Sequence, residues 1–107
     1  MNKRTKAVSI PQKVKKAVWE RDNHCCVYCG SPYANPEAHY IPRSKGGLGV
    51  ERNILTLCRS CHNRYDHTDD RREMATFFRE YLKCCYADWD EKTLTYGGKK
   101  RCLTKSF

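Results

Sequence analysis

The chain has 107 residues and a mass of 12.6 kDa, so it holds one domain with no room for a second independent core. Hydrophobic residues make up 39% and the mean hydropathy is −0.86, with no apolar run long enough for a membrane span or a secretory signal. The 21 Lys and Arg against 12 Asp and Glu give a net charge of +9, which favours a polyanionic partner such as nucleic acid.

The first third of the chain predicts a basic arm, a short helix and a knuckle. Residues 1–9 carry basic side chains without apolar periodicity, which is typical of a flexible arm. Pro11 suits the first turn of a helix, and apolar residues at helical spacing predict an amphipathic helix that ends near Arg21. From Cys25 to Pro36 the chain is rich in cysteines and turn formers, which predicts a tight knuckle followed by a loop.

The middle of the chain predicts a β-hairpin followed by a helix. A short strand is expected at about residues 37–41, and a second at 54–57 that pairs back on it. The glycine-rich run at 45–49 between them predicts an open loop. Residues 59–67 lack Gly and Pro and predict a helix, which gives a small α+β fold.

A longer amphipathic helix is expected from about Asp70 to Ala87. Asp70 and Glu73 resemble a capping box, and apolar residues recur at helical spacing as Met74, Phe77, Phe78, Tyr81, Leu82 and Cys85. We expect this stripe to pack on the preceding elements, and a dimer seam is the alternative. Residues 88–107 have little patterning and are expected to form a partly disordered tail, so the folded domain would span residues 10–87.

Two CxxC pairs predict a structural zinc site. Cys26 with Cys29 and Cys58 with Cys61 are separated by 28 residues, a spacing that lets two knuckles supply four thiolates to one tetrahedral zinc. The expected compartment is the reducing cytoplasm, where metal binding explains paired cysteines better than disulfides do. Cys25 could replace Cys26 only with a CxxxC spacing. The remaining cysteines, Cys84, Cys85 and Cys102, are interpreted as packing residues or free thiols.

A zinc ion with four cysteine ligands has no free coordination position, so it stabilises a fold but catalyses no reaction. The candidates for catalysis are therefore the histidines. His39 is expected at the end of a strand, before a flexible basic loop, where its imidazole can stay accessible to solvent. With an ordinary pKa near 6.5, histidine is the natural general base at neutral pH. A histidine that merely lies on the surface of a strand is the alternative.

Three motifs in order resemble the zinc-stapled HNH endonuclease family. They read Cys26-x-x-Cys29-Gly30, then His39-x-Ile41-Pro42-Arg43-Ser44-x-Gly46-Gly47, then Asn53-Ile54-x-x-Leu57-Cys58-x-x-Cys61-His62 with Asp66. The resemblance covers roughly residues 10–67. It implies a ββα-metal finger, in which a two-stranded hairpin and a helix hold one divalent cation against the scissile phosphate.

The resemblance assigns roles to the matching residues. It makes His39 the general base for a metal-dependent DNA endonuclease and Asn53 the residue that ties down the loop, so that His39 points correctly. It places His62 and Asp66 on one Mg²⁺ or Mn²⁺ ion, which neutralises charge on the leaving oxygen. The alternatives are an ordinary turn asparagine at position 53 and an exposed ion pair between His62 and Asp66.

One position departs from the family pattern. The residue before the general base is usually an aspartate or histidine that binds the metal, and here it is Ala38. Glu37 does not replace that ligand, because strand side chains alternate and Glu37 shares the face of His39. Glu37 could instead orient His39. A weakly held cation with His62, Asp66, waters and substrate oxygens is expected, and the alternative draws His39 itself into the metal shell.

We expect contacts to the nucleic acid backbone from basic residues on the loop and the metal helix, namely Arg43, Lys45, Arg59 and Arg64. No base-reading helix is evident, so specificity is low or comes from a partner protein. RNA as substrate, a monomer or a dimer, and a prokaryotic or phage origin all stay open. The rival function is a non-catalytic zinc-stapled nucleic-acid-binding module, whereas a protein-interaction zinc knuckle fits the charge of +9 poorly.

Overall fold

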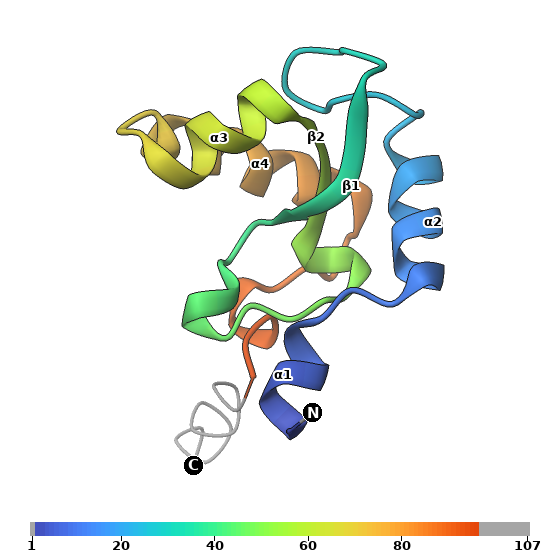
Figure 1. Cartoon of the computed structure of the whole chain (residues 1–107), viewed down its shortest axis with the longest axis vertical. Helices are drawn as coiled ribbons and strands as arrows, with labels where there is room; N and C mark the ends of the chain where they lie inside the picture. Colours follow the sequence, from blue (N-terminus) through green and yellow to red (C-terminus); the bar gives the residue numbers. More distant parts are fainter. Residues whose placement is uncertain (1, 97–107) are drawn as a thin grey trace.

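A computed structural model of the chain describes residues 2–96. A two-stranded sheet lies at the centre, formed by β1 (Ala34–His39) and β2 (Ile54–Cys58). Helix α2 (Gln12–Arg21) lies on one side of the hairpin, and α3 (Arg59–His67) with α4 (Arg71–Cys85) lies on the other (Figure 1). The small α+β fold expected from the sequence is confirmed. Within the described residues, no helix is both long and apolar enough to span a membrane.

The strands pair antiparallel with one irregularity. His39 pairs with Ile54 and Ala38 with Leu55, but the register shifts between Asn35 and Ala38. The extra residue in β1 is a β-bulge, a feature that accommodates Pro36, which has no N–H to donate. The strand therefore begins and ends earlier than the expected 37–41, whereas the expected second strand is confirmed as β2, one residue longer.

The basic arm is helical, which contradicts the expectation of a flexible segment. Residues Lys3–Val8 form α1, and the side chain of Asn2 caps it by accepting a hydrogen bond from the amide of Thr5 at 2.7 Å. Val8 is buried, and the amide of Gly49 donates to the carbonyl of Ala7 at 3.0 Å. Long-range contacts that local periodicity does not encode thus hold α1 against the loop between the strands.

The helix expected from Pro11 to about Arg21 is confirmed as α2 and the one expected over 59–67 as α3, and the long helix ends at Cys85, before Ala87. Pro11 is the residue that precedes α2 and not its first turn. Asp70 makes no capping hydrogen bond, because its carboxylate accepts from Arg64 Nε at 3.1 Å instead. The stripe on α4 buries Met74, Phe78 and Leu82 against the sheet and α3, while Phe77 and Cys85 remain exposed.

Residues 88–96 are packed, so the expectation of a partly disordered tail is wrong for this part. Trp89 and Leu94 join the main hydrophobic core, and the indole N–H of Trp89 donates to the carbonyl of Arg52 at 2.8 Å. The short 3-10 helix Glu91–Thr93 precedes an isolated bridge between Thr95 and Gly47. The rest of the expected tail lies outside the described residues.

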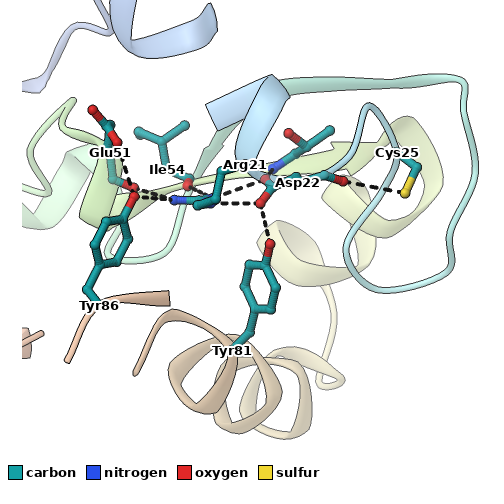
Figure 2. Close-up of polar contacts among 8 residues, drawn as sticks. Arg21, Asp22, Cys25, Glu51, Ile54, Tyr81 and Tyr86 are labelled. Carbon is teal, nitrogen blue, oxygen red and sulfur yellow. Dashed lines mark hydrogen bonds and ion pairs between the residues drawn. The ribbon is translucent and has the colours of Figure 1, made fainter. Parts of the chain in front are cut away.

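A buried ion pair joins α2 to β2 and α4 (Figure 2). Arg21 and Asp22 end α2, and their side chains form a bidentate pair with distances of 2.7 and 3.0 Å. The guanidinium also donates to the carbonyl of Ile54 at 2.7 Å, and the carboxylate accepts from the amide of Thr56 at 2.9 Å and from the hydroxyl of Tyr81. The two charged groups are thus paired with each other and also form hydrogen bonds with β2 and α4.

We predict that Asp22→Ala lowers the free energy of unfolding by about 3–5 kcal/mol, since it leaves the buried guanidinium without its partner. Urea unfolding of the zinc-loaded protein measures the change. The matched control is Asp88→Ala, which breaks an exposed ion pair to Arg52 and is expected to cause no measurable change. Equal effects of the two substitutions would contradict the role assigned to Asp22.

Candidate metal and nuclease site

The two CxxC pairs converge at one point of the structure. The Sγ atoms of Cys26, Cys29, Cys58 and Cys61 all lie within 4.8 Å of one another, and those of Cys29 and Cys58 are 3.6 Å apart. Tetrahedral zinc with Zn–S distances of about 2.3 Å needs sulfur atoms about 3.8 Å apart. The four cysteines therefore fit a zinc ion. Cys25 lies outside this group, and its thiol donates to the carbonyl of Asp22 at 3.5 Å.

Local structure aims these four sulfur atoms inward. Gly30, at φ +83°, turns the first knuckle, and the amide of Cys29 donates to Cys26 Sγ at 3.5 Å. In the second knuckle Cys58 caps α3, because its Sγ accepts from the amide of Cys61 at 3.4 Å. Backbone N–H groups pointing at sulfur favour the thiolate form, which is the form that binds metal.

The electrostatics of the cluster differ from one thiol to the next. Burial opposes ionisation of Cys26, but hydrogen bonds from backbone amides outweigh it and lower the pKa of Cys26 to about 7. Burial, together with the neighbouring thiols, raises the pKa of Cys61 well above its ordinary value. A bound divalent cation would lower the cost of ionising these buried, closely spaced thiols, since it stabilises all four thiolates together.

His39, His62 and Asp66 line one cleft of about 680 Å³. His39 comes from the end of β1, whereas the other two residues come from one face of α3. Three of the four motif residues that the sequence proposes for chemistry are thus gathered into one cavity from two elements, whereas Asn53 is not part of its lining. Within residues 2–96, no group of three or more His, Cys, Asp or Glu side chains other than the four cysteines comes together closely enough to hold a metal.

A backbone carbonyl orients the imidazole of His39. Its Nε2 lies 2.9 Å from the carbonyl oxygen of Val8. A carbonyl only accepts hydrogen bonds, so Nε2 carries the proton and Nδ1 is left with a lone pair. Burial lowers the pKa of His39 below its ordinary value, an effect that outweighs the hydrogen bond to Val8. His39 is therefore neutral at pH 7, with a nitrogen able to accept a proton.

Val8 reaches His39 because α1 docks closely on the loop between the strands. A Cβ built on Gly49 would lie 1.9 Å from the carbonyl oxygen of Ser9, so only glycine permits this approach. Arg4 adds two hydrogen bonds of 3.3 Å to the carbonyls of Arg43 and Ser44. The N-terminal helix thereby completes the surroundings of His39, a function that nothing in its composition indicates.

His62 and Asp66 lie one helical turn apart on α3. His62 Nε2 is 3.1 Å from Asp66 Oδ2, and both side chains are a little over one-third exposed. The other carboxylate oxygen of Asp66 lies 3.9 Å from Arg71, whose guanidinium stacks on the ring of Tyr65 and donates to its carbonyl at 2.8 Å. Arg71, which sequence reasoning missed, thus anchors the acidic side of the cleft.

Asn53 ties down the loop that follows His39. Its side chain is fully buried, accepts from the amide of Ile41 at 2.8 Å and donates to the carbonyls of Ile41 and Leu48 at 3.2 and 2.9 Å. Its backbone carbonyl accepts from the amide of Tyr40 at 2.8 Å. These bonds connect Asn53 to both ends of the loop between the strands.

Ala38 and Glu37, the two residues before His39, contribute neither a metal ligand nor a contact that orients His39. Ala38 is fully buried in the hydrophobic core, so this position contributes nothing to the cleft. Glu37 does line the cleft, but it pairs with Lys15 at 3.3 Å. The expectation that Glu37 orients His39 is therefore wrong, since Val8 provides that contact.

A model of the HNH endonuclease family matches residues 26–68, the segment that contains the four cysteines, His39, Asn53, His62 and Asp66. The chain is also 34% identical over 55 residues to Anaredoxin of Nostoc sp., an alignment that covers 50% of this chain and 72% of that protein. This chain belongs to the HNH endonuclease family. Its two-stranded hairpin followed by α3 is the family's finger, and the four cysteines bring the knuckle before β1 together with the junction of β2 and α3.

The four basic residues expected to contact nucleic acid are not equivalent in this HNH fold. Arg43 lines the cleft with His39, and Arg59 lines a smaller adjoining pocket with His62 and Asp66. Lys45 is exposed on the loop, and Arg64 is turned toward Asp70 and the ring of Tyr28. Lys15 and Arg71, which the sequence did not single out, also line the cleft.

Loss of one cysteine of the cluster is predicted to cost the HNH domain its metal. We expect Cys61→Ser to lower the zinc content well below one ion per chain and to lower the Tm, because binding energy at such a site is largely folding energy. Elemental analysis and thermal melting measure both. Cys25→Ser, one residue before Cys26, is the control and is expected to keep full zinc; a loss of zinc there instead would show that the ligand set is misassigned.

His39 is predicted to titrate below the ordinary histidine pKa of about 6.5, since burial disfavours its charged form. With the folded pKa below the unfolded one, the folded state loses stability as pH falls through this interval. Nitrogen-15 NMR of the imidazole should show a neutral Nε2–H tautomer at pH 7. A midpoint at or above 6.5, or a protonated Nδ1, would contradict the assigned environment.

Proposed function

We propose that this protein is a metal-dependent DNA endonuclease that hydrolyses phosphodiester bonds in the cleft between β1 and α3. The observation that supports this most directly is the shared cleft of His39, His62 and Asp66, in which the imidazole of His39 keeps an unprotonated Nδ1. A neutral histidine beside a potential cation site is the combination that phosphodiester hydrolysis requires.

In this mechanism His39 activates the attacking water. Its Nδ1 accepts a proton from the water while the water oxygen forms a bond to phosphorus and the bond to the leaving oxygen breaks. The bond from Nε2 to the carbonyl of Val8 holds the ring in place and stabilises the charge that the imidazole gains. Asn53 acts as a positioning residue, because it holds the loop that starts directly after Tyr40.

His62 and Asp66 fit the requirements of a divalent cation such as Mg²⁺ or Mn²⁺. Their nearest nitrogen and oxygen atoms are 3.1 Å apart, and adjacent ligands at about 2.1 Å from an octahedral ion lie about 3.0 Å apart. Bound there, the cation would neutralise charge on the phosphate and its leaving oxygen. Arg71 and the helix hold Asp66 in place for this role.

Cations around the cleft suit the phosphates of a nucleic acid. Lys15, Arg43 and Arg71 line it together with the two carboxylates of Glu37 and Asp66. Contacts of this kind do not depend on sequence, so specificity would be low or supplied by a partner protein, with the chain acting as a monomer or a dimer. The thiolate cluster favours a reducing compartment, in accordance with a cytoplasmic protein of a prokaryote or phage.

A second function is favoured by one observation. The buried Ala38 supplies no ligand, and the cation site has only two protein ligands, so a zinc-stapled module that binds nucleic acid without cutting it is the rival. Such a module would have no need for a neutral, oriented His39. Its affinity for DNA would also be independent of Mg²⁺ or Mn²⁺, whereas cleavage would not.

Cleavage of supercoiled plasmid tests the proposal. Zinc-loaded wild-type protein is expected to nick or linearise plasmid with Mg²⁺ or Mn²⁺, and His39→Ala is expected to reduce the rate by at least about 100-fold, the usual contribution of a general base. Both proteins must contain equal zinc. If the wild type binds plasmid but cuts neither plasmid nor branched DNA with any divalent metal, the binding module replaces the enzyme.

The metal ligands are tested with a matched pair of substitutions. Asp66→Asn removes a proposed ligand and is expected to raise the Mn²⁺ concentration needed for half-maximal cleavage by about 10-fold or more. Asp69→Asn makes the same change on an exposed residue three positions away and is expected to leave cleavage unchanged. Equal metal dependence in the two variants would remove Asp66 from the cation site.

A further inference from the structure

A second groove, of about 750 Å³, lies between α2 and the first half of β1. We call it the Trp19 groove and define it by Lys13, Lys16 and Trp19 of α2 and by Ala34 and Pro36 of β1. Its lining is more apolar than that of the catalytic cleft, with lysines beside an aromatic ring. None of the roles assigned to the cleft uses these residues.

The end of α2 supports the aromatic side chain of the groove. The rings of Trp19 and His24 are stacked with centroids 5.0 Å apart and an angle of 8° between their planes. His24 and its neighbour Asn23 both have φ of +60°, the left-handed conformation in which helices commonly end, and the amide of His24 donates to the carbonyl of Trp19 at 3.0 Å. His24 also lies 3.3 Å from Glu20 one turn back. The way in which α2 ends thus places a second ring against the indole.

The charges of the groove suit a polyanion. Lys15 pairs with Glu37 at 3.3 Å, so the one carboxylate that lines the groove is neutralised. Lys13 and Lys16 are exposed and make no ion pair with any residue in the described part of the chain. Two unpaired ammonium groups therefore stand beside an aromatic surface.

The groove continues into the catalytic cleft. Lys15 and Glu37 line both cavities, so a chain that lies in the groove leads directly toward His39. We propose that the Trp19 groove binds an unpaired nucleic acid strand next to the scissile phosphate, with a base on Trp19 and phosphates on Lys13 and Lys16. The path of the strand from the groove to the scissile phosphate rests on the proposed nuclease function. The proposal predicts that nucleic acids with an unpaired segment are the preferred substrates.

The chemistry favours an unpaired strand over a duplex. Base faces within a duplex are covered by neighbouring base pairs, whereas an unpaired base offers a free face to an aromatic side chain. Stacking on indole combined with a basic track is the pattern by which proteins hold single strands with little dependence on sequence. A purely duplex-binding surface would need lysines but no braced tryptophan.

Fluorescence anisotropy tests the stacking contact with zinc-loaded protein and no added Mg²⁺ or Mn²⁺, so that no cleavage is required. The probes are a labelled 16-nucleotide oligothymidylate and a labelled 16-base-pair duplex. Trp19→Leu is expected to weaken binding of the single strand by about 5-fold or more and binding of the duplex less than 2-fold. Trp19→Tyr should retain most of the affinity. Phe77→Leu, an exposed aromatic residue on α4, is the control and should change neither.

A second, matched pair tests the lysines. The double substitution Lys13→Gln with Lys16→Gln should reduce the salt dependence of single-strand binding by about 1.4 in the slope of log K against log salt, which corresponds to two phosphate contacts. Lys83→Gln with Lys92→Gln removes the same charge from exposed lysines elsewhere and should leave the slope unchanged. If the slope of log K against log salt is the same in the two double variants, the effect comes from net charge alone. The assignment of Lys13 and Lys16 as phosphate contacts is then overturned.

The outcomes separate this proposal from the nuclease proposal. If plasmid is not cut but single-strand binding depends on Trp19, the enzyme fails and the groove stands. If plasmid is cut through His39 but Trp19→Leu binds both probes like the wild type, or weakens both equally, the groove proposal is overturned. A 16-residue polyglutamate is the last competitor. If it displaces the labelled oligothymidylate as strongly as unlabelled oligothymidylate does, and Trp19→Leu weakens both competitors equally, the site binds acidic peptides and the groove proposal is overturned.

Discussion

Strand β2 is buried along its whole length, and yet within residues 2–96 it has a neighbouring strand on only one side. All five of its residues are buried, so the backbone groups on its free edge cannot reach water and would be costly if they had no hydrogen-bond partner in the protein. The end of α2 and the first knuckle solve this problem. Arg21 donates to the carbonyl of Ile54, Asp22 accepts from the amide of Thr56, and the amide of Val27 donates to the carbonyl of Thr56 at 3.0 Å.

This edge determines where both halves of the site lie. Because Val27 is bonded to β2, the adjacent Cys26 is held beside Cys58 and Cys61 at the end of the same strand. Asn53 precedes β2 and holds the loop after His39, while Cys58 ends the strand and caps α3. The cysteine cluster and the cleft are therefore positioned by one short strand, with Asn53 before its first residue and Cys58 at its last.

Local patterns in the sequence were sufficient for the hairpin, α2, α3 and the cysteine cluster. The helices and strands depend on periodicity over a few residues, and the cluster depends on the spacing within each CxxC pair, while the hairpin bridges the 28 residues between the pairs. The motif also singles out Asn53, whose side chain makes three hydrogen bonds to the loop between the strands. These are the parts of the fold in which local preference and tertiary packing agree.

The missed features depend on contacts between distant residues. Helix α1 was interpreted as flexible because its docking depends on the close approach of Ser9 to Gly49, forty residues later. Trp89 and Leu94 belong to the core without any periodic pattern that would identify them. Asp70 had the sequence of a helix cap, but Arg64, on the preceding helix, binds its carboxylate. In each case a partner outside the local segment decided the outcome.

The departure at Ala38 has a physical consequence for the proposed chemistry. The methyl group packs in the core where the family pattern has a ligand, so the strand stabilises the fold at this position and not the cation. With only His62 and Asp66 from the protein, a cation would need water and phosphate oxygens to complete its shell. Each of the metal ion and the nucleic acid would then raise the affinity for the other. The basic side chains of the cleft and the Trp19 groove would help to retain the metal ion, because they hold the nucleic acid in place.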